Sequence, residues 1–247
     1  MQAKKTLGQN FLSNPAIAET ILRAGEVKKG DNILEVGPGM GFLTDFLLKS
    51  GANVTAVEKD DRLISSLKAK FPSLTLIHGD ILEYSHSGNY KIIANIPYYI
   101  TGEFFRRFLQ ETAQPSLVII MVQKEVAERI ASEEKESILS LSVKIFGDPK
   151  YIETIKAENF DPVPKVDSAI LAIYNIKKPR DIDLQRFFEI VHAGFAHKRK
   201  VLINNLEKIA PKEVLGKIWN ELSLNPKIRA EDIHILTWKK IAQMLNS

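Results

Sequence analysis

The stretch Glu35-Val36-Gly37-Pro38-Gly39-Met40-Gly41 decides the predicted fold of this chain. A short apolar segment, residues 32–34, precedes it, and residues 42–48, whose apolar side chains have helical spacing, follow it. The order of strand, glycine loop and helix lets a backbone approach a nucleotide closely. The third glycine falls one residue too early for a G-x-G-x-x-G dinucleotide loop, so we expect a nucleoside with an amino-acid tail.

Two further predicted strands end on acidic side chains. Residues 54–57 run into Glu58, which lies 19 residues beyond Gly39. That spacing is close to the ~20 residues expected for an acid that accepts hydrogen bonds from ribose hydroxyls. Residues 74–78 run into Asp80, which should lie on the same sheet edge and accept from an adenine amine. A single acid is often a helix cap, but acids after successive strands favour one binding site.

A fourth predicted strand, residues 91–94, leads into Asn95-Ile96-Pro97-Tyr98. The Asn95 side-chain oxygen and the Ile96 carbonyl, next to a proline without an N–H, can accept both hydrogens of an exocyclic amine. The ring of Tyr98 can stack on the base that carries this amine. Taken alone, the same four residues are equally compatible with a plain turn after a strand.

In this order the motifs resemble those of S-adenosylmethionine-dependent N6-adenine methyltransferases. Gly8–Leu12 is similar to the first motif of the ribosomal RNA adenine dimethyltransferases, and Asn159–Ser168 to their late F-x-P-x-P-x-V-x-S motif. Phe195–Leu206 resembles the basic segment of the small-subunit (16S-type) N6,N6-dimethyltransferases, the kasugamycin-sensitivity methyltransferases. The resemblance covers nearly the whole chain. It implies a Rossmann-like α/β sheet with helices on both faces and a small all-α C-terminal domain.

The resemblance also implies the activity and the site. It implies transfer of methyl groups from S-adenosyl-L-methionine to two adjacent adenines near the 3′ end of small-subunit rRNA, each becoming N6,N6-dimethylated. Phe160 would close over the target base opposite Tyr98, although a core position for Phe160 is the alternative. Glu35 is open between a cofactor contact and a supporting acid. The expected cofactor-binding residues are Asn10, Leu12, Glu35, Gly37, Gly39, Glu58, Lys59, Asp80, Ile81 and Asn95, and the expected catalytic residues are Asn95, Ile96, Pro97, Tyr98 and Phe160.

Composition narrows the class of protein. The 247 residues are 45% hydrophobic and 26% charged, which is ordinary for a globular protein. Cysteine is absent, which excludes disulfides and thiolate metal sites, and the five histidines lack metal-ligand spacing, so we expect no metal. No apolar run approaches the ~20 residues of a membrane span, and the N-terminus lacks a signal core, so we expect a cytoplasmic protein. We also expect a monomer.

Basic residues concentrate near the end of the chain. From Gln185 to Ser247 there are eleven Lys or Arg against six Asp or Glu, while the whole chain has a net charge of +4. A solvated helical surface would explain this pattern, but the cluster at 197–200 favours contacts with RNA phosphates. The expected RNA contacts are Arg106, Arg107, Lys198, Arg199 and Lys200.

Alternating strand and helix patterns predict an α/β domain over residues 1–178, and the resemblance implies that it is the catalytic, S-adenosylmethionine-binding domain. After a linker at 177–181 only helical patterns follow, which predicts a helical domain over residues 181–247, and the resemblance implies that it recognises RNA. Three local features are also expected: a helix N-cap at Ser13, a helical pattern over 124–145, and a stiff loop without strand over 160–168.

Other functions remain open at this stage. A large-subunit rRNA adenine methyltransferase of the resistance type would share the cofactor motifs and residues 95–98. A nucleic-acid-binding factor that has lost catalysis could use the same scaffold. An NAD-dependent oxidoreductase is disfavoured by the glycine spacing.

Overall fold

The computed structural model of the protein describes residues 9–110 and 113–245. The described chain forms two compact units. Residues 9–128 and Gly147–Lys177 make up the first unit, and Arg129–Phe146 with the residues from Lys178 onward make up the second. The main division therefore falls near the expected linker, but an internal segment also packs with the C-terminal helices. Within the described residues, no helix combines the length and apolarity needed to cross a membrane.

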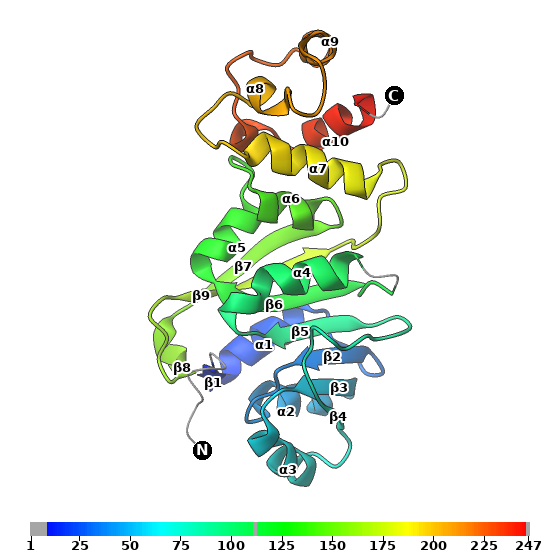
Figure 1. Ribbon diagram of the computed structural model, residues 1–247. Coiled ribbons are helices and arrows are strands. Elements are labelled where there is room, and N and C mark those ends of the chain that lie inside the picture. The colour runs from blue at the N-terminus through cyan, green and yellow to red at the C-terminus, as the bar shows by residue number, and fades with distance from the viewer. Residues whose placement is uncertain (1–8, 111–112, 246–247) are drawn as a thin grey trace. The chain divides into compact units, whose positions relative to one another are not determined.

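A seven-stranded sheet forms the centre of the first unit, with the order β4-β3-β2-β5-β6-β9-β7 (Figure 1). The strands from β4 to β6 pair in parallel, whereas β9 is antiparallel to both β6 and β7. This arrangement confirms the Rossmann-like α/β sheet expected from the sequence. The strand bounds are β2 (Asn32–Val36), β3 (Asn53–Glu58), β4 (Thr75–His78), β5 (Lys91–Asn95), β6 (Leu117–Gln123), β7 (Asp148–Ile155) and β9 (Ser168–Tyr174).

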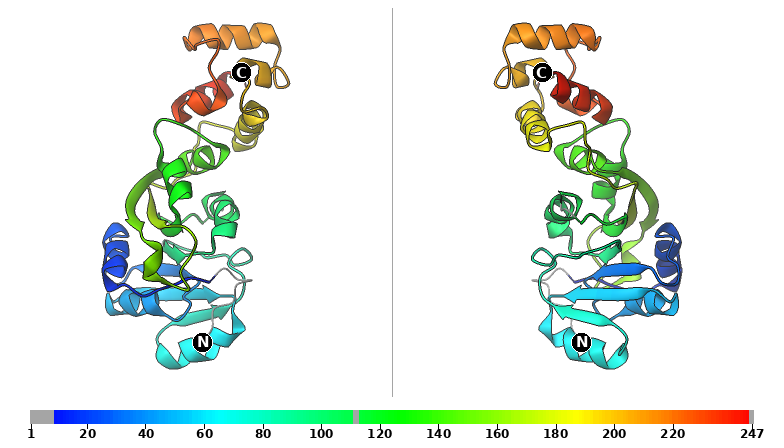
Figure 2. Two further views of the ribbon diagram at one scale, coloured as in Figure 1. Left: turned by 90° about the vertical axis from the view of Figure 1, so that its left-hand side faces the viewer. Right: turned by 90° about the vertical axis from the view of Figure 1, so that its right-hand side faces the viewer.

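Helices cover both faces of this sheet (Figure 2). Helices α1 (Pro15–Ala24) and α2 (Phe42–Lys49) bury Ile17, Ile21 and Leu47 in one apolar cluster with residues of the central strands. Helix α4 (Thr101–Gln110), preceded by the 3₁₀ turn η2 (Tyr98–Ile100), lies on the opposite face. Because both faces are covered, β6 is buried at every position but its last and reads as a continuous apolar run. Helix α3 (Asp61–Lys70) packs beside β4.

Two local expectations, at Ser13 and at 160–168, were wrong, and the expected helical stretch at 124–145 is interrupted. The N-cap of α1 is Asn14, not Ser13, because the Asn14 side chain accepts from the Ala16 N–H at 3.0 Å. The stretch 124–145 forms two helices, α5 (Lys124–Ala131) and α6 (Ile138–Lys144), because Ser137 and Ser140 make a capping box that starts a new helix. Residues Phe160–Asp161 form a short strand, β8, because β1 (Phe11–Leu12) pairs with them.

The second unit is helical, as expected for the C-terminal region. Its core surrounds Trp238, whose ring stacks on Phe195 with 5.8 Å between centroids. Gly194 lies against the same indole, and an added Cβ there would come within 2.5 Å of it. A buried ion pair of 2.8 Å joins Lys144 to Glu136. Besides α6 the unit contains α7 (Leu184–Phe195), α8 (Leu202–Leu206), α9 (Lys212–Glu221), η4 (Ala230–Asp232) and α10 (Ile235–Met244).

Candidate active site

A cavity of about 280 Å³ opens at the carboxyl ends of β4, β3, β2 and β5. The chain runs outward from β2 to β4 and then returns to β5 on the other side, so this is where the strand order reverses. Ligands of open α/β sheets bind at such a point. The predicted cofactor residues line the cavity together with Ile96, Pro97 and Tyr98, and the full predicted cofactor set is Asn10, Leu12, Glu35, Gly37, Gly39, Glu58, Lys59, Asp80, Ile81 and Asn95.

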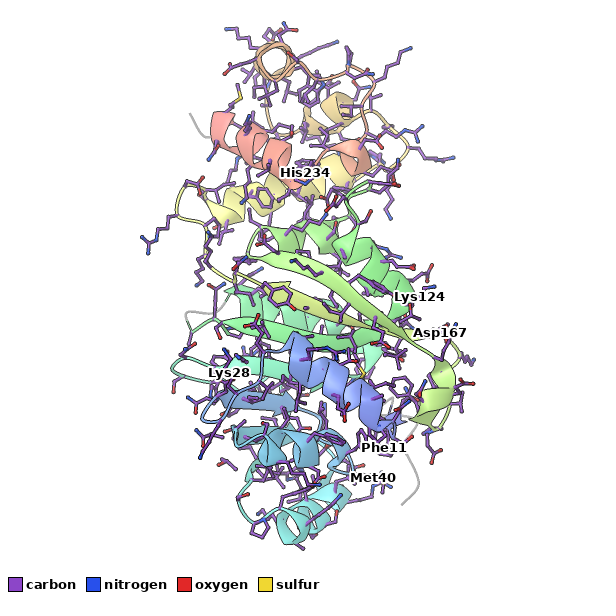
Figure 3. The ribbon with its side chains drawn as sticks, turned by 180° about the vertical axis from the view of Figure 1, so that it is seen from behind. Phe11, Lys28, Met40, Lys124, Asp167 and His234 are labelled. Atoms are coloured by element: carbon purple, nitrogen blue, oxygen red, sulfur yellow. The ribbon has the colours of Figure 1, made fainter. Side chains whose placement is uncertain are left out.

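The glycine loop lies directly against the N-terminal segment. Gly39 has a φ of +59°, which favours glycine, and an added Cβ would lie 2.9 Å from the ring of Phe11. Phe11 and Met40 accordingly lie close together at the same end of the sheet in Figure 3. The Gly39 N–H donates to Glu58 Oε2 at 3.1 Å, so the loop is also tied to the end of β3. Of the predicted first motif, Gly8 lies outside the described residues.

Glu58 is buried and holds two backbone groups. Besides Gly39 it accepts from the Asp60 N–H, through Oε1 at 2.8 Å. Burial raises the pKa of Glu58, and the hydrogen bonds from Asp60 and Gly39 act in the opposite direction. A carboxylate has about four acceptor positions, so two backbone bonds leave capacity for ribose hydroxyls.

Glu35 is the most deeply buried acid of the cavity wall. Burial raises its pKa to about 8; the hydrogen bond from Thr44, 2.7 Å long, lowers it, and the nearby charge of Glu58 adds to the rise. Its carboxyl group is thus held on the β2 side of the cavity in an environment that disfavours negative charge unless a cation is bound nearby.

Asp80 and Lys59 form an ion pair of 2.6 Å across the ends of β4 and β3. Asp80 also accepts from the Leu82 N–H at 3.0 Å. Burial works against ionisation of Asp80, but the bonds from Lys59 and Leu82 outweigh it and hold the pKa below its ordinary value. Asp80 is therefore a charged acceptor at neutral pH.

The amide of Asn95 is oriented by the protein. Its Nδ2 donates to the backbone carbonyl of Asn10 at 3.1 Å. A carbonyl can only accept, so this bond selects the nitrogen for one side and turns Oδ1 the other way. Asn95 and Ile96 both line the cavity.

The two aromatic residues after Pro97 differ in setting. Tyr98 is half-buried, and its hydroxyl lies 2.7 Å from Ser168 Oγ; burial raises its pKa, and that hydrogen bond lowers it. Tyr99 lines the same cavity but is 66% exposed. Phe160 is only 3% exposed, packs in the apolar core cluster and is not part of the cavity lining. The stacking role of Phe160 stays a prediction.

The predicted RNA contacts fall in both units. Arg107 donates to the Tyr84 carbonyl and to Ser85 Oγ, each at 3.1 Å, so its guanidinium holds a loop of the first unit. Arg106 is exposed and lies 3.6 Å from Glu103. In the second unit, residues 198–200 form an exposed turn after α7, not part of a helix. The phosphate contacts stay a prediction.

Sequence reasoning missed several lining residues, among them Tyr99, Met40 and Gln9. Tyr99 and Met40 line the cavity, and both are large and exposed. Gln9 donates to Asp60 Oδ2 at 2.9 Å and lines the cavity too. Gln9 stood inside the quoted first motif, but nothing in its spacing indicated a partner 51 residues away. Among the described residues, no cluster of His, Cys, Asp or Glu has the arrangement of a metal site.

The fold and this site define a Rossmann-like methyltransferase with S-adenosyl-L-methionine as methyl donor. The model of the family "Ribosomal RNA adenine dimethylase" matches residues 1–247, and the chain belongs to that family. A relative named ribosomal RNA small subunit methyltransferase A from Dehalococcoides mccartyi is 38% identical over 98% of this chain and 88% of its own length. The relative of the same name from Fusobacterium nucleatum subsp. nucleatum is 38% identical over 94% and 93%.

Two solved structures share the fold. The 23S rRNA methyltransferase ErmE has a TM-score of 0.81 and 23% identity, with 96% of this chain and 100% of the other covered. A dimethyladenosine transferase from Plasmodium falciparum also has a TM-score of 0.81 and 23% identity, covering 96% and 98%. At this identity the likeness concerns the fold alone.

Proposed function

We propose that this enzyme dimethylates the N6 atoms of two adjacent adenines near the 3′ end of small-subunit rRNA, as part of small-subunit maturation. The observation that carries the proposal is the bond from the Asn95 nitrogen to the Asn10 carbonyl, which leaves the Asn95 oxygen available as an acceptor. The 38% identity to relatives named for the small subunit supports that choice of substrate. We further propose that the protein acts in the cytoplasm as a monomer.

The cavity residues fit the donor. Gly39 has no room for a side chain beside Phe11, and Gly37 likewise has a positive φ, so the loop backbone can approach a ligand closely. Glu58 would hold the ribose, Asp80 the adenine amine, and Asn10, Leu12 and Glu35 the methionine end. The flanking residues Lys59 and Ile81 would border the adenine. When bound, S-adenosyl-L-methionine supplies an electrophilic methyl group on a sulfonium.

Asn95 and Ile96 would activate the acceptor amine. The lone pair of an adenine amine is delocalised into the ring, which makes the amine a poor nucleophile. In the first transfer, two acceptors, Asn95 Oδ1 and the Ile96 carbonyl, would each accept a hydrogen bond from one amine hydrogen and draw the nitrogen toward tetrahedral geometry. The N–C bond forms as the S–C bond of the sulfonium breaks, which leaves a neutral thioether; the nitrogen then carries a positive charge and loses a proton to solvent, so no strong general base is needed. Alignment of the reacting groups then supplies much of the rate, up to ~7–11 kcal/mol.

Aromatic stacking would hold the extruded base. The Tyr98 ring is fixed by its hydroxyl contact with Ser168, and base–aromatic stacking contributes ~1–3 kcal/mol per base. Phe160 would supply the opposite face if its side chain turns out of the core on RNA binding. The helical second unit would bind RNA backbone through Lys198, Arg199 and Lys200, with Arg106 and Arg107 contributing from the first unit.

Labelled-methyl transfer tests the proposal. Purified protein with labelled donor is offered small and large ribosomal subunits that lack the modification, and the products are mapped by mass spectrometry. We expect dimethyladenosine at two adjacent positions of the small-subunit rRNA only. Uptake by the large subunit alone would assign the enzyme to the resistance-type substrate, and no uptake by either RNA would favour a non-catalytic binding factor.

The variant Asn95→Ala makes the test specific to the site. We expect its single-turnover rate to fall on the order of 10²-fold, because an acceptor that acts in the transition state is lost, with donor affinity within a few fold of the wild type. An unimpaired rate would remove Asn95 from its proposed role.

A further inference from the structure

We propose that Gln9 is a positioning residue for methyl transfer: its bond to Asp60 holds the N-terminal segment so that the Asn10 carbonyl fixes the orientation of the Asn95 amide. This inference rests on the function proposed above. It assigns a role to two residues, Gln9 and Asp60, that lie outside the predicted catalytic and cofactor-binding sets.

Asp60 anchors the Gln9 side chain. Asp60 is 1% exposed, caps helix α3 by accepting from the Arg62 N–H, and forms a 2.6 Å ion pair with the Arg62 guanidinium. The Gln9 side chain donates to Asp60 Oδ2 at 2.9 Å. A buried carboxylate already fixed by a helix N-terminus and an arginine is a rigid acceptor, so Gln9 is tied to the framework of the sheet.

The Gln9 side-chain bond to Asp60 and the Asn10 carbonyl bond to Asn95 belong to one short segment. Gln9 and Asn10 are consecutive, so a fixed Gln9 side chain limits the movement of the Asn10 carbonyl. Leu12 is 7% exposed and pairs with Phe160 in the β1–β8 ladder. The segment is therefore held at both of its ends, with Phe11 pressed against Gly39 between them.

The side-chain amide of Asn95 has two possible orientations. The oxygen and nitrogen of an Asn side chain have nearly the same shape, so turning the group by 180° costs little unless hydrogen bonds distinguish them. The Asn10 carbonyl accepts only, and its 3.1 Å bond selects Nδ2. If that carbonyl moves, Asn95 can present N–H donors to the cavity, where an adenine amine would also donate.

The same chain of bonds reaches the donor site. The Asp60 N–H donates to Glu58 Oε1 at 2.8 Å, and Glu58 Oε2 accepts from Gly39. Glu58, Asp60, Gln9, Asn10 and Asn95 thus form one connected path from the proposed ribose acid to the proposed catalytic amide. Through this path, the residues that would bind the donor also hold the Asn95 amide in its orientation.

Two variants of similar size separate the hydrogen bond from the bulk of the side chain. Gln9→Glu removes the donor and places a carboxylate beside Asp60, whereas Gln9→Lys keeps a donor to the same carboxylate. At saturating S-adenosyl-L-methionine we expect Gln9→Glu to lower the single-turnover rate about tenfold or more, because small displacements of reacting groups reduce rates steeply. Gln9→Lys should restore most of that loss, and the exposed Gln185→Glu is the control for the added charge.

The preference for adenosine over inosine in RNA binding would not change if Gln9 had only a structural role. Binding is measured, with S-adenosylhomocysteine present, to a small-subunit 3′-end RNA fragment that carries either adenosine or inosine at the target positions. Inosine has a carbonyl where adenosine has the amine, so two acceptors in the site should reject it. We expect the preference for adenosine to fall several fold in Gln9→Glu and to be retained in Gln9→Lys.

Proton exchange of the Asn95 side-chain amide reports whether its hydrogen bond to the Asn10 carbonyl is intact. In ¹⁵N-labelled free protein, with Asn95→Ala used to assign the signal, exchange should accelerate in Gln9→Glu and not in Gln9→Lys. Equal exchange and equal discrimination in both variants would overturn the positioning role, as would a rate in Gln9→Glu that equals the wild type. If the wild type itself methylates no rRNA, the proposed function fails, while amide exchange still decides the role of Gln9.

Discussion

The hydroxyl of Thr44, in the first turn of α2, donates a 2.7 Å hydrogen bond to Glu35 at the end of β2. Thr44 is fully buried and Glu35 is 2% exposed. The helix that follows the glycine loop therefore supplies a direct partner for the acid that precedes it. Burial raises the pKa of Glu35, a residue of the cavity wall, and the Thr44 hydroxyl lowers it.

The raised pKa of Glu35 predicts a pH dependence of stability. The pKa is about 8 in the folded protein against an ordinary value of 4.5, so between these values the unfolded chain loses the proton while the folded chain keeps it. The contribution is complete below pH 4.5 and is lost as the pH rises through 8, amounting to at most about 5 kcal/mol. Denaturant unfolding across this range should show a decline for the wild type that is absent from Glu35→Gln; parallel curves would contradict the pKa.

Replacing the hydroxyl partner should move that decline. Thr44→Val removes the bond that favours the charged carboxylate, so the pKa of Glu35 rises further and stability is lost toward higher pH. The part-buried Thr55→Val, on β3, is the control for the same change of side chain. A decline at the wild-type pH in Thr44→Val would show that Thr44 does not act on Glu35.

Phe160 offers a test of core packing against stacking. Because the ring is buried, Phe160→Ala should lower the free energy of unfolding by about 3–5 kcal/mol, whereas Phe160→Leu should cost less than about 1.5 kcal/mol. If Phe160 also stacks on the target adenine, Phe160→Leu should still lower methyl transfer about tenfold. A Leu variant that is stable and transfers methyl at the wild-type rate would confine Phe160 to the core.

Asp80 should affect donor affinity more than turnover. Asp80→Ala removes the proposed acceptor for the donor adenine, so calorimetry should show S-adenosyl-L-methionine binding weakened about tenfold, with the rate at saturating donor retained. Lys59→Met removes a partner that is 56% exposed, and an ion pair with solvent access contributes little, so its effect should stay below about threefold. A larger loss in Lys59→Met than in Asp80→Ala would contradict this assignment.

The exposed turn 198–200 should set part of the salt dependence of RNA binding. Each phosphate contact contributes about 0.7 to 0.9 to the slope of log affinity against log salt. Replacing Lys198, Arg199 and Lys200 by Ala should therefore reduce the slope by about 2. The matched control replaces three exposed lysines of the first unit, Lys28, Lys49 and Lys68, and an equal reduction there would indicate a general charge effect.

Local patterns in the sequence located much of the cavity. Gly39, Glu58, Asp80 and Asn95 each follow a predicted strand, and in the structure they meet at one edge of the sheet. This worked because parallel strands bring their carboxyl ends together, so residues far apart in the chain share a site without any pairwise signal between them. The predicted strand bounds agree with the structure to within a few residues.

Contacts made by irregular segments escaped prediction. The β1–β8 pairing joins a segment before β2 to a segment between β7 and β9, and the Arg107 side chain holds a loop more than twenty residues earlier. Phe160 illustrates the difference: its motif resembled an active-site motif, yet its side chain is packed in the core. Two-residue strands and side-chain hydrogen bonds have no period along the chain, so only the folded packing reveals them.

The sequence by itself determined the sheet, the glycine loop and the chemical types at the ends of the strands, because apolar periodicity and turn residues act over a few positions. Only the tertiary structure decided which atom of the Asn95 amide is bonded to the protein and which stays available as an acceptor. That choice depends on a carbonyl 85 positions earlier, and on the bond from Gln9 to Asp60 that holds it. Hydrogen-bond direction is a property of partners in space, and no local pattern specifies those partners.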